Sequence, residues 1–340
     1  MAGSRVTAAQ VAERAGVSKA AVSRVFNPGR SVSPTLADKV TRAANELGYS
    51  PNLLARSLSL GRTRMIGLIV PYLYNQYYAE VLEQISLAFQ TVNYRVLVFV
   101  LPKTASAIEH VVDDLLRYRV DGLIVASVVL SSQLAERCIE AGVPILLFNR
   151  VEGNGSFPSV TSDNLRGGRY AAQHLLALGH QRIGYIAGWE DASTQRDRET
   201  GFRETLQTQG LDLHSRGVGN FIRDDAVAAA LAMFDRADHP SAVFVANDFM
   251  AFAVVDVLRH NLGLRVPEDV SVVGFGDIAM ASWPAYHLTT IRQQTQKMVQ
   301  RAVSMMLEMI EEDTEETTSV VIQNTLVVRS STAQYGKIDT

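Results

Sequence analysis

The stretch "VTAAQVAERAGVSKAAVSRVFN", residues 6–27, predicts two short helices joined by a tight turn. Thr7 and Gln10 have the spacing of a capping box, so the first helix should begin directly after Thr7. Gly16 supplies the backbone freedom that the turn needs, and Ser18 can cap the second helix. The inward positions hold mainly alanine and valine, so the two helices can cross closely. This pattern is typical of a helix-turn-helix, which lays its second helix in the major groove of DNA.

The N-terminal residues of the second helix would then lie nearest the base edges. These residues are Lys19, Ala20, Ser23 and Arg24. The side chain of Ala20 cannot form a hydrogen bond with a base, so this residue could recognise only the shape of the DNA or a thymine methyl group.

A third helix is indicated from Ser33 to Gly48, with proline at its first position and glycine as its terminator. Residues 1–64 carry ten Lys and Arg against three acidic residues, a net charge of +7. The rest of the chain carries 22 basic and 32 acidic residues, a net charge of −10, which gives −3 for all 340 residues. A basic head on an acidic body indicates a polyanionic partner for the head alone.

The segment "YSPNLLARSLSLGRT", residues 49–63, follows the head. Leu54, Ala55 and Leu58 share one helical face, but so short a helix is unstable by itself. We therefore expect it to be helical only when a partner holds it; the alternative is a plain linker.

From Met65 onward, continuous apolar runs such as "MIGLIVP" and "VSVVGFG" alternate with amphipathic helical stretches. This alternation predicts parallel sheets covered by helices on both faces. The number of elements favours two similar lobes, with "SVTSD", "LTTIRQ" and "VVIQNTL" as strands or crossings between them.

Ligands of such sheets bind at the carboxyl ends of the strands, and between two lobes these ends face a shared cleft. We therefore searched the residues that follow each predicted strand. Aromatic rings can cover the faces of a sugar ring, while Asn, Arg and Asp can bind its hydroxyl groups. The candidate set is Asn75, Tyr77, Tyr78, Asn149, Arg150, Asp163, Arg198, Phe221, Asn247, Asp277 and Gln293. Asp248 is equally well explained as a helix cap.

The quoted helix-turn-helix and "VSPTLADKVTRAANELGYSPNLLARSL" closely resemble the head and hinge of the lactose repressor / galactose repressor family, and the resemblance extends to about residue 335. It implies an all-α helix-turn-helix head (1–50), a hinge (51–61) and a two-lobed periplasmic-binding-protein-like α/β body (62–340) with parallel doubly wound sheets. The first lobe would hold about 62–160 and 292–319, and the second 161–291 and 320–340.

The resemblance also implies that the hinge becomes helical on an operator and inserts a leucine, here Leu58, into the minor groove. Nine of the pocket candidates match positions that line a ribose-type pocket in such proteins: all except Asp163 and Asp277. The DNA-binding set implied is Thr7, Ser18, Lys19, Ala20, Ser23, Arg24, Asn27, Asn52, Ala55 and Leu58. The expected protein is a transcriptional regulator, most often a repressor, that binds an inverted-repeat operator as a homodimer.

One departure from the family pattern concerns the effector. Many members have Gly-Tyr-Asp after a late strand, whereas this chain has "GFGD", with Gly276 in place of the aspartate and Asp277 after it. Either the pocket loses a carboxylate or Asp277 replaces it. With Arg150 and Arg198 then less balanced, a sugar acid is a candidate beside a neutral sugar or polyol, and a nucleobase or other metabolite remains.

Other functional classes find little support in the sequence. The apolar runs are shorter than the ~20 residues of a membrane span, and we expect a cytoplasmic protein. The seven histidines lack metal-ligand spacing, and neither a phosphate-binding GxxxxGK[ST] nor a GxSxG nucleophile motif occurs, so we expect no enzyme, metal or cofactor. A sugar-binding transport component is the main competitor, but it would need an export signal instead of a basic head.

Overall fold

The computed structural model describes residues 6–26, 32–50, 62–101, 106–128, 132–151, 156–312 and 318–336. The chain divides between Thr63 and Arg64 into two compact units, a head and a body. Four predicted DNA-binding residues, Asn27, Asn52, Ala55 and Leu58, and the whole predicted hinge lie outside the described residues. None of the helices in the described ranges has the length and apolar character needed to cross a membrane.

The head contains α1 (Ala8–Ala15), α2 (Lys19–Phe26) and α3 (Pro34–Leu47). The capping box forms at the start of α1, where Thr7 N donates to Gln10 Oε1 at 2.8 Å and Gln10 N donates to Thr7 Oγ1 at 3.4 Å. Gly16 adopts the left-handed conformation (φ 62°) that ends α1 and lets the chain turn into α2.

The core of the head is small and built from short side chains. Val11, Val22 and Val40, one from each helix, are fully buried, and four buried alanines pack beside them: Ala12, Ala15, Ala43 and Ala44. Because the inward side chains are short, the helix backbones pack closely, and the polar face of α2 is left outside.

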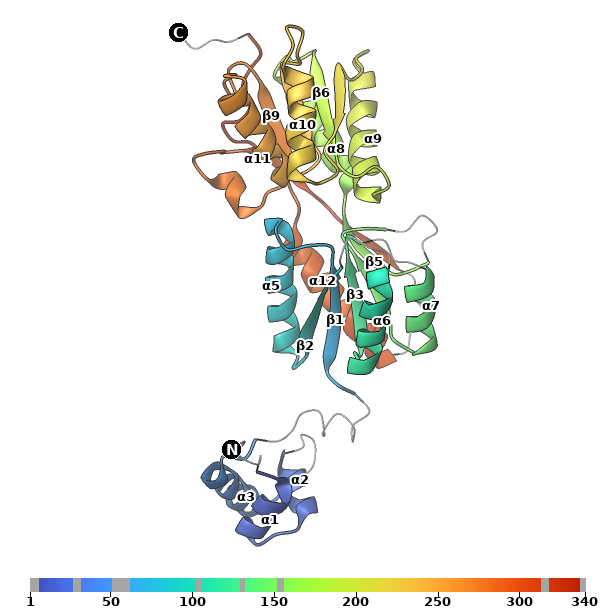
Figure 1. The fold of residues 1–340 in the computed structure, drawn as a ribbon, viewed down its shortest axis with the longest axis vertical. Coiled ribbons are helices and arrows are strands. Elements are labelled where there is room, and N and C mark those ends of the chain that lie inside the picture. The colour runs from blue at the N-terminus through green and yellow to red at the C-terminus, as the bar shows by residue number, and fades with distance from the viewer. Residues whose placement is uncertain are drawn as a thin grey trace. The chain divides into compact units, whose positions relative to one another are not determined.

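The first lobe of the body is built on a six-stranded sheet with the order β11-β5-β4-β3-β1-β2, in which all neighbours run parallel. Alternate residues of β1 point to opposite faces: Ile66, Leu68 and Val70 belong to one apolar cluster, and Ile69 to another. Helices α5 and α12 pack on the first face, and α6 and α7 on the second (Figure 1). The elements are β1 (Met65–Val70), α5 (Gln76–Thr91), β2 (Arg95–Val100), α6 (Ser106–Tyr118), β3 (Gly122–Ala126), α7 (Ser132–Glu140), β4 (Ile145–Phe148), β5 (Ser159–Ser162), α12 (Thr295–Glu312) and β11 (Ser319–Ile322).

The second lobe has a sheet of the order β12-β10-β9-β8-β6-β7, parallel except for β12, which runs antiparallel to β10. Helices α8 and α9 cover one face, and α10 and α11 the other. The elements are α8 (Asn164–Ala177), β6 (Ile183–Ala187), α9 (Ser193–Gln207), β7 (Ser215–Val218), α10 (Arg223–Phe234), β8 (Ala242–Val245), α11 (Asp248–Asp256), a π-helical extension (Val257–Asn261), β9 (Ser271–Gly276), a 3-10 turn (Ala279–Ser282), β10 (Thr289–Arg292) and β12 (Thr325–Val327).

The chain passes between the lobes three times, after β5, after β10 and between β11 and β12. The sequence suggested a last crossing near residue 319, but this crossing lies at residues 323–324. The reason is that β11 pairs with β5 and so remains in the first sheet. Asn324 Nδ2 donates to Asp163 O at 2.8 Å, which joins this crossing to the first one. The carboxyl ends of both sheets therefore meet beside the crossings.

Candidate functional site

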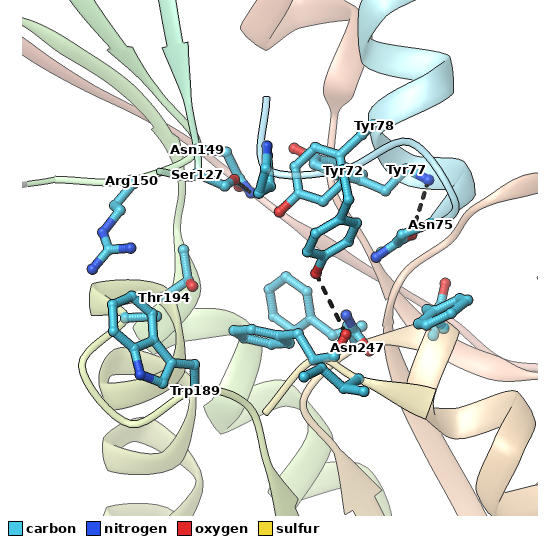
Figure 2. Close-up of a pocket in the computed structure, with 18 of the residues that line it drawn as sticks. Tyr72, Asn75, Tyr77, Tyr78, Ser127, Asn149, Arg150, Trp189, Thr194 and Asn247 are labelled. Atoms are coloured by element: carbon cyan, nitrogen blue, oxygen red, sulfur yellow. Dashed lines mark hydrogen bonds between the residues drawn. The ribbon is translucent and has the colours of Figure 1, made fainter. Parts of the chain in front are cut away.

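A cavity of about 700 Å³ lies between the two lobes of the body, at the carboxyl ends of their strands. Its wall is contributed by segments that follow β1, β2, β3 and β4 in the first lobe and β6, β7, β8, β9 and β10 in the second, together with the first turns of α5, α9 and α11. Figure 2 shows Tyr72, Tyr78 and Asn149 from the first lobe facing Asn247 and Trp189 from the second. The volume is in the range of pockets that enclose a small organic ligand.

Nine of the eleven predicted pocket residues line this cavity. They are Asn75, Tyr77, Tyr78, Asn149, Arg150, Arg198, Phe221, Asn247 and Gln293. Asn75 also caps α5 by accepting a hydrogen bond from Tyr77 N at 3.1 Å, so the first turn of the helix carries both tyrosines into the pocket (Figure 2).

Two predicted residues lie elsewhere, and the expectation for them is corrected. Asp277 is held by Arg292 and by Arg329, whose Nη2 lies 2.7 Å from Asp277 Oδ1, and it is not among the pocket-lining residues. Gly276 and Asp277 have φ values of 144° and 59°, and this backbone turn directs the carboxylate away from the cavity. Asp163 is half-buried and caps α8 by accepting from Arg166 N at 3.0 Å, and it is not among the residues that line the cavity.

The guanidinium group of Arg198 is buried in the wall of the second lobe. Its Nε donates to Asn164 Oδ1 at 2.8 Å and its Nη1 donates to Ala246 O at 2.6 Å. Burial lowers the pKa of Arg198 to about 10, so the group stays charged at neutral pH. Arg198 is therefore a fixed cation at one wall of the pocket.

Asn247 and Asp248 stand at the start of α11. Asn247 accepts the cap bond from Met250 N at 2.9 Å through Oδ1. Asp248 also lines the cavity, accepting from Thr290 Oγ1 at 2.6 Å and from Ile278 N at 3.1 Å. Burial raises the pKa of Asp248 to about 6, although these hydrogen bonds act in the opposite direction.

Aromatic residues that the strand-end search did not select cover much of the remaining wall. Tyr72 and Tyr74 stack with ring centres 4.3 Å apart, and Arg150 lies over the Trp189 ring at 5.0 Å. Trp189 comes two residues after β6, within the same distance of a strand end as candidates that the search did select, such as Phe221 after β7. The other members that the search missed include Ser127, Thr194, Phe249 and Phe275.

Hydrogen bonds between described residues cross from one lobe to the other around the cavity. Tyr72 OH donates to Phe221 O at 3.4 Å inside the pocket (Figure 2). Ala279 N donates to Glu80 Oε1 at 3.2 Å beside it. Arg150 Nη2 also donates to Asp191 O at 3.0 Å, and Val151 N donates to Ser193 Oγ at 3.2 Å. These bonds form only when the lobes approach each other, so their number depends on the angle between the lobes.

The head presents a second candidate surface. Six of the ten predicted DNA-binding residues are described, and all six are exposed: Thr7, Ser18, Lys19, Ala20, Ser23 and Arg24. Ala21 and Val22 of the same helix are buried in the head core, so α2 turns one face inward and its basic face to solvent. Ser18 Oγ accepts from Ala21 N at 3.1 Å and caps α2 at the end that carries Lys19.

Two family models match the chain. Residues 7–52 match the bacterial regulatory proteins of the lacI family, and residues 172–332 match the periplasmic binding protein-like domain. These ranges contain the described helix-turn-helix and most of the second lobe.

Curated relatives match over nearly the whole length. The chain is 36% identical over 338 residues to the HTH-type transcriptional regulator CelR of Thermobifida fusca, which covers 96% of this chain and 98% of that protein. It is 31% identical to the HTH-type transcriptional repressor PurR of Vibrio vulnificus, with 96% and 98% covered.

Solved structures agree. The lac repressor dimer bound to operator and the anti-inducer ONPF matches with a TM-score of 0.87 and 30% identity, covering 97% of this chain and 99% of that one. A complex of the transcriptional regulator CelR with cellobiose matches with a TM-score of 0.73 and 33% identity, covering 96% and 100%.

Proposed function

Since the chain belongs to the lacI family of bacterial regulatory proteins, we propose that it is an effector-responsive transcriptional repressor that binds an inverted-repeat operator as a dimer. One observation carries the proposal: a basic, exposed helix-turn-helix face and a two-lobed body with a polar and aromatic cavity between its lobes occur on the same chain. We propose further that it acts in the cytoplasm, by binding its effector and not by converting it.

The DNA side of the proposal rests on α2. Lys19, Ser23 and Arg24 are exposed on the helix that a helix-turn-helix inserts into the major groove. Phosphate neutralisation by basic side chains dominates affinity, while the exposed N-terminal residues of α2 would select the bases. The assignment of Asn27, Asn52, Ala55 and Leu58 to DNA contacts stays a prediction.

The effector side rests on the cavity. A carbohydrate would place its ring faces against Tyr72, Trp189 and Phe221 and its hydroxyl groups against the amides and charged groups. Cellobiose is the first candidate to test, because the CelR relative has been solved in complex with it. A nucleobase or similar metabolite that acts as a corepressor is the alternative.

The cross-lobe hydrogen bonds suggest how the effector would control DNA binding. A ligand that contacts both lobes favours one angle between them over others. It therefore increases the fraction of molecules whose lobes are held together. In a dimer this angle would change the distance between the two hinge segments and hence their ability to pair on the operator. Coupling is reciprocal, so operator DNA must change effector affinity by the same factor as effector changes DNA affinity.

Fluorescence anisotropy with the full chain tests the proposal. A palindromic duplex selected from a random pool by the protein should bind at least about 10³-fold more tightly than a scrambled duplex of the same composition. Two chains should bind per palindrome, and cellobiose should change the affinity for the palindrome more than that for the scrambled duplex. Equal affinity for both duplexes, with and without effector, would exclude a role as a specific regulator.

A further inference from the structure

A row of exposed arginines lies at the amino ends of three neighbouring strands of the first lobe. The strand order places β1 between β3 and β2, and all three run parallel, so the residues that lead into them share one edge of the sheet (Figure 1). This edge lies at the opposite end of the strands from the cavity. Its arginines, all exposed, are Arg62 and Arg64 before β1, Arg95 at the start of β2, and Arg117 and Arg119 before β3. We call this set the arginine edge.

The arginine edge carries an excess of positive charge. Five arginines and two aspartates, a net charge of +3, occur in its three segments: 62–65, 93–95 and 114–121. Asp114 Oδ1 lies 3.8 Å from Arg117 Nη1, and Asp121 Oδ2 accepts from the backbone N of Arg64 at 2.8 Å. The chain after Arg64 has a net charge of −10, so this edge differs in sign from the body around it. Clustered like charges repel one another, and a polyanionic partner removes that repulsion.

The backbone of the arginine edge is held by hydrogen bonds. Arg64 O accepts from Arg95 N at 2.9 Å, and Met65 O accepts from Asp121 N at 2.8 Å, which joins the three segments. Arg64 and Arg119 have φ values of 55° and 49°, a left-handed conformation that is uncommon for residues other than glycine. Such a conformation persists only where the surrounding contacts fix it. The arginines therefore project from a fixed backbone, so binding a partner costs less conformational entropy than it would from a disordered loop.

The place of this edge in the chain indicates its partner. The predicted hinge, residues 51–61, ends directly before Arg62, and Leu58 of that hinge is predicted to enter the minor groove. Arg64 follows Leu58 by six positions. A fully extended chain of that length spans at most about 22 Å, so the arginine edge stays close to the DNA whenever the hinge is bound. Duplex DNA carries one phosphate per about 1.7 Å of its axis, which makes phosphate the anion that this edge would meet.

We propose that the arginine edge binds phosphates of the DNA backbone next to the hinge, so that the body adds DNA affinity without reading sequence. Guanidinium groups suit this role because each presents five donors in a plane and can bind a phosphate through two of them. The inference rests on the proposed DNA-binding function. It extends the DNA contact surface from the head and the hinge to the body.

Neutral substitutions in the full chain test the inference. The test variant is Arg95→Gln/Arg117→Gln/Arg119→Gln, which leaves the two arginines beside the hinge unchanged. Its anisotropy titrations at about 100 mM salt should show at least about tenfold weaker binding of the palindrome, and the slope of log affinity against log salt should fall by about one or more. Affinity for the scrambled duplex should fall as well, because phosphate contacts carry no sequence information. The corresponding triple lysine variant keeps the charge and should stay within about threefold of the unmodified protein.

The matched control removes the same charge from the corresponding edge of the second lobe. It is Arg182→Gln/Arg236→Gln/Arg265→Gln, three exposed arginines near the amino ends of β6, β8 and β9. Its affinity for the palindrome should stay within about threefold of the unmodified protein, with an unchanged salt slope. Thermal midpoints of all variants should be recorded beside the titrations. Unchanged affinity and slope in the test variant, or an equal loss in the control, would overturn the inference.

Uncharged methylphosphonates, placed singly along the palindrome, show whether the contact is direct. Neutralising a phosphate that the arginine edge binds should weaken binding of the unmodified protein and have little effect on the test variant. The control variant should respond to each methylphosphonate as the unmodified protein does. The inference fails if no phosphate shows this coupling to the test variant.

The same titrations separate this inference from the proposed function. A protein that selects the palindrome but is insensitive to the test variant remains a regulator whose DNA contacts lie in other parts of the chain. A protein that binds both duplexes equally is not a specific regulator, and the comparison of the test variant with the control on either duplex still decides the inference.

Discussion

The guanidinium carbon of Arg198 lies 3.6 Å from the centre of the Phe275 ring. The ring belongs to β9, while the hydrogen bonds of Arg198 reach Asn164 at the start of α8 and Ala246 after β8. One side chain from α9 therefore connects three other elements of the second lobe at the wall of the pocket. Removing it would change both the pocket and the packing of the lobe.

Arg198→Ala should abolish the effector response and leave operator binding without effector within about threefold of the unmodified protein. It leaves two buried acceptors without a partner, each at a cost of about 1–3 kcal/mol, so the thermal midpoint should fall as well. Anisotropy with and without sugar measures the effector response, and calorimetry measures the thermal midpoint. The control is Arg203→Ala in the same helix, because Arg203 pairs with Glu199 and Asp212 away from the cavity. Unchanged effector affinity in Arg198→Ala would remove this residue from the pocket.

Arg24→Ala should weaken operator binding by about 1–3 kcal/mol and reduce the slope of log affinity against log salt by about one, if the side chain contacts a phosphate as well as a base. Arg24 is exposed on α2. Arg14→Ala is the comparison, since Arg14 lies on α1 and pairs with Glu46 at 2.6 Å. Titrations of the palindrome at several salt concentrations give both quantities. Affinity and slope equal to those of the unmodified protein would refute the assignment of α2 as the recognition helix.

Asp248→Asn should stabilise the effector-free body at neutral pH. Burial raises the pKa of Asp248 to about 6, above the ordinary value of 3.8, so between these values the folded protein binds more protons than the unfolded chain. The free energy of unfolding contributed by this group therefore falls as pH rises from about 4 to about 6, by up to roughly 3 kcal/mol, and stays low above that. The stabilisation by Asp248→Asn should be larger at pH 7.5 than at pH 4.5 in thermal unfolding followed by circular dichroism. An equal difference at both pH values would contradict a raised pKa.

Trp189 should report effector binding by fluorescence. It lies at the pocket beside Arg150, whereas Trp283, the other tryptophan of the chain, is 50% exposed and is not among the pocket-lining residues. A bound ligand displaces water from the Trp189 ring, so its emission should shift to shorter wavelength during a cellobiose titration. Trp283→Phe should retain this shift and Trp189→Phe should lose it. If Trp189→Phe retained the shift and Trp283→Phe lost it, the ligand would bind away from the described cavity.

The alternation of apolar runs and helical stretches was sufficient to predict two parallel sheets with helices on both faces. The positions at which the chain crosses between the lobes could be located only from the pairing of the strands in the structure. "VVIQNTL" could belong to either sheet by its pattern, and only the pairing of β11 with β5 assigns its first part to the first lobe. This pairing joins residues about 160 positions apart in the chain. A local sequence pattern cannot predict which distant strand a segment pairs with.

Local patterns in the sequence predicted the helix-turn-helix and nine residues that line the cavity, because helix periodicity is local and parallel strands all present their carboxyl ends at one edge. Which carboxylate lies at the wall of the cavity could be read only from the folded chain. Asp277 follows Gly276 directly, yet the left-handed backbone there turns it to Arg292 and Arg329, while Asp248 from another strand end occupies the space beside Gly276. Charge placement in the pocket depends on distances between segments far apart in the chain, and those distances exist only after folding.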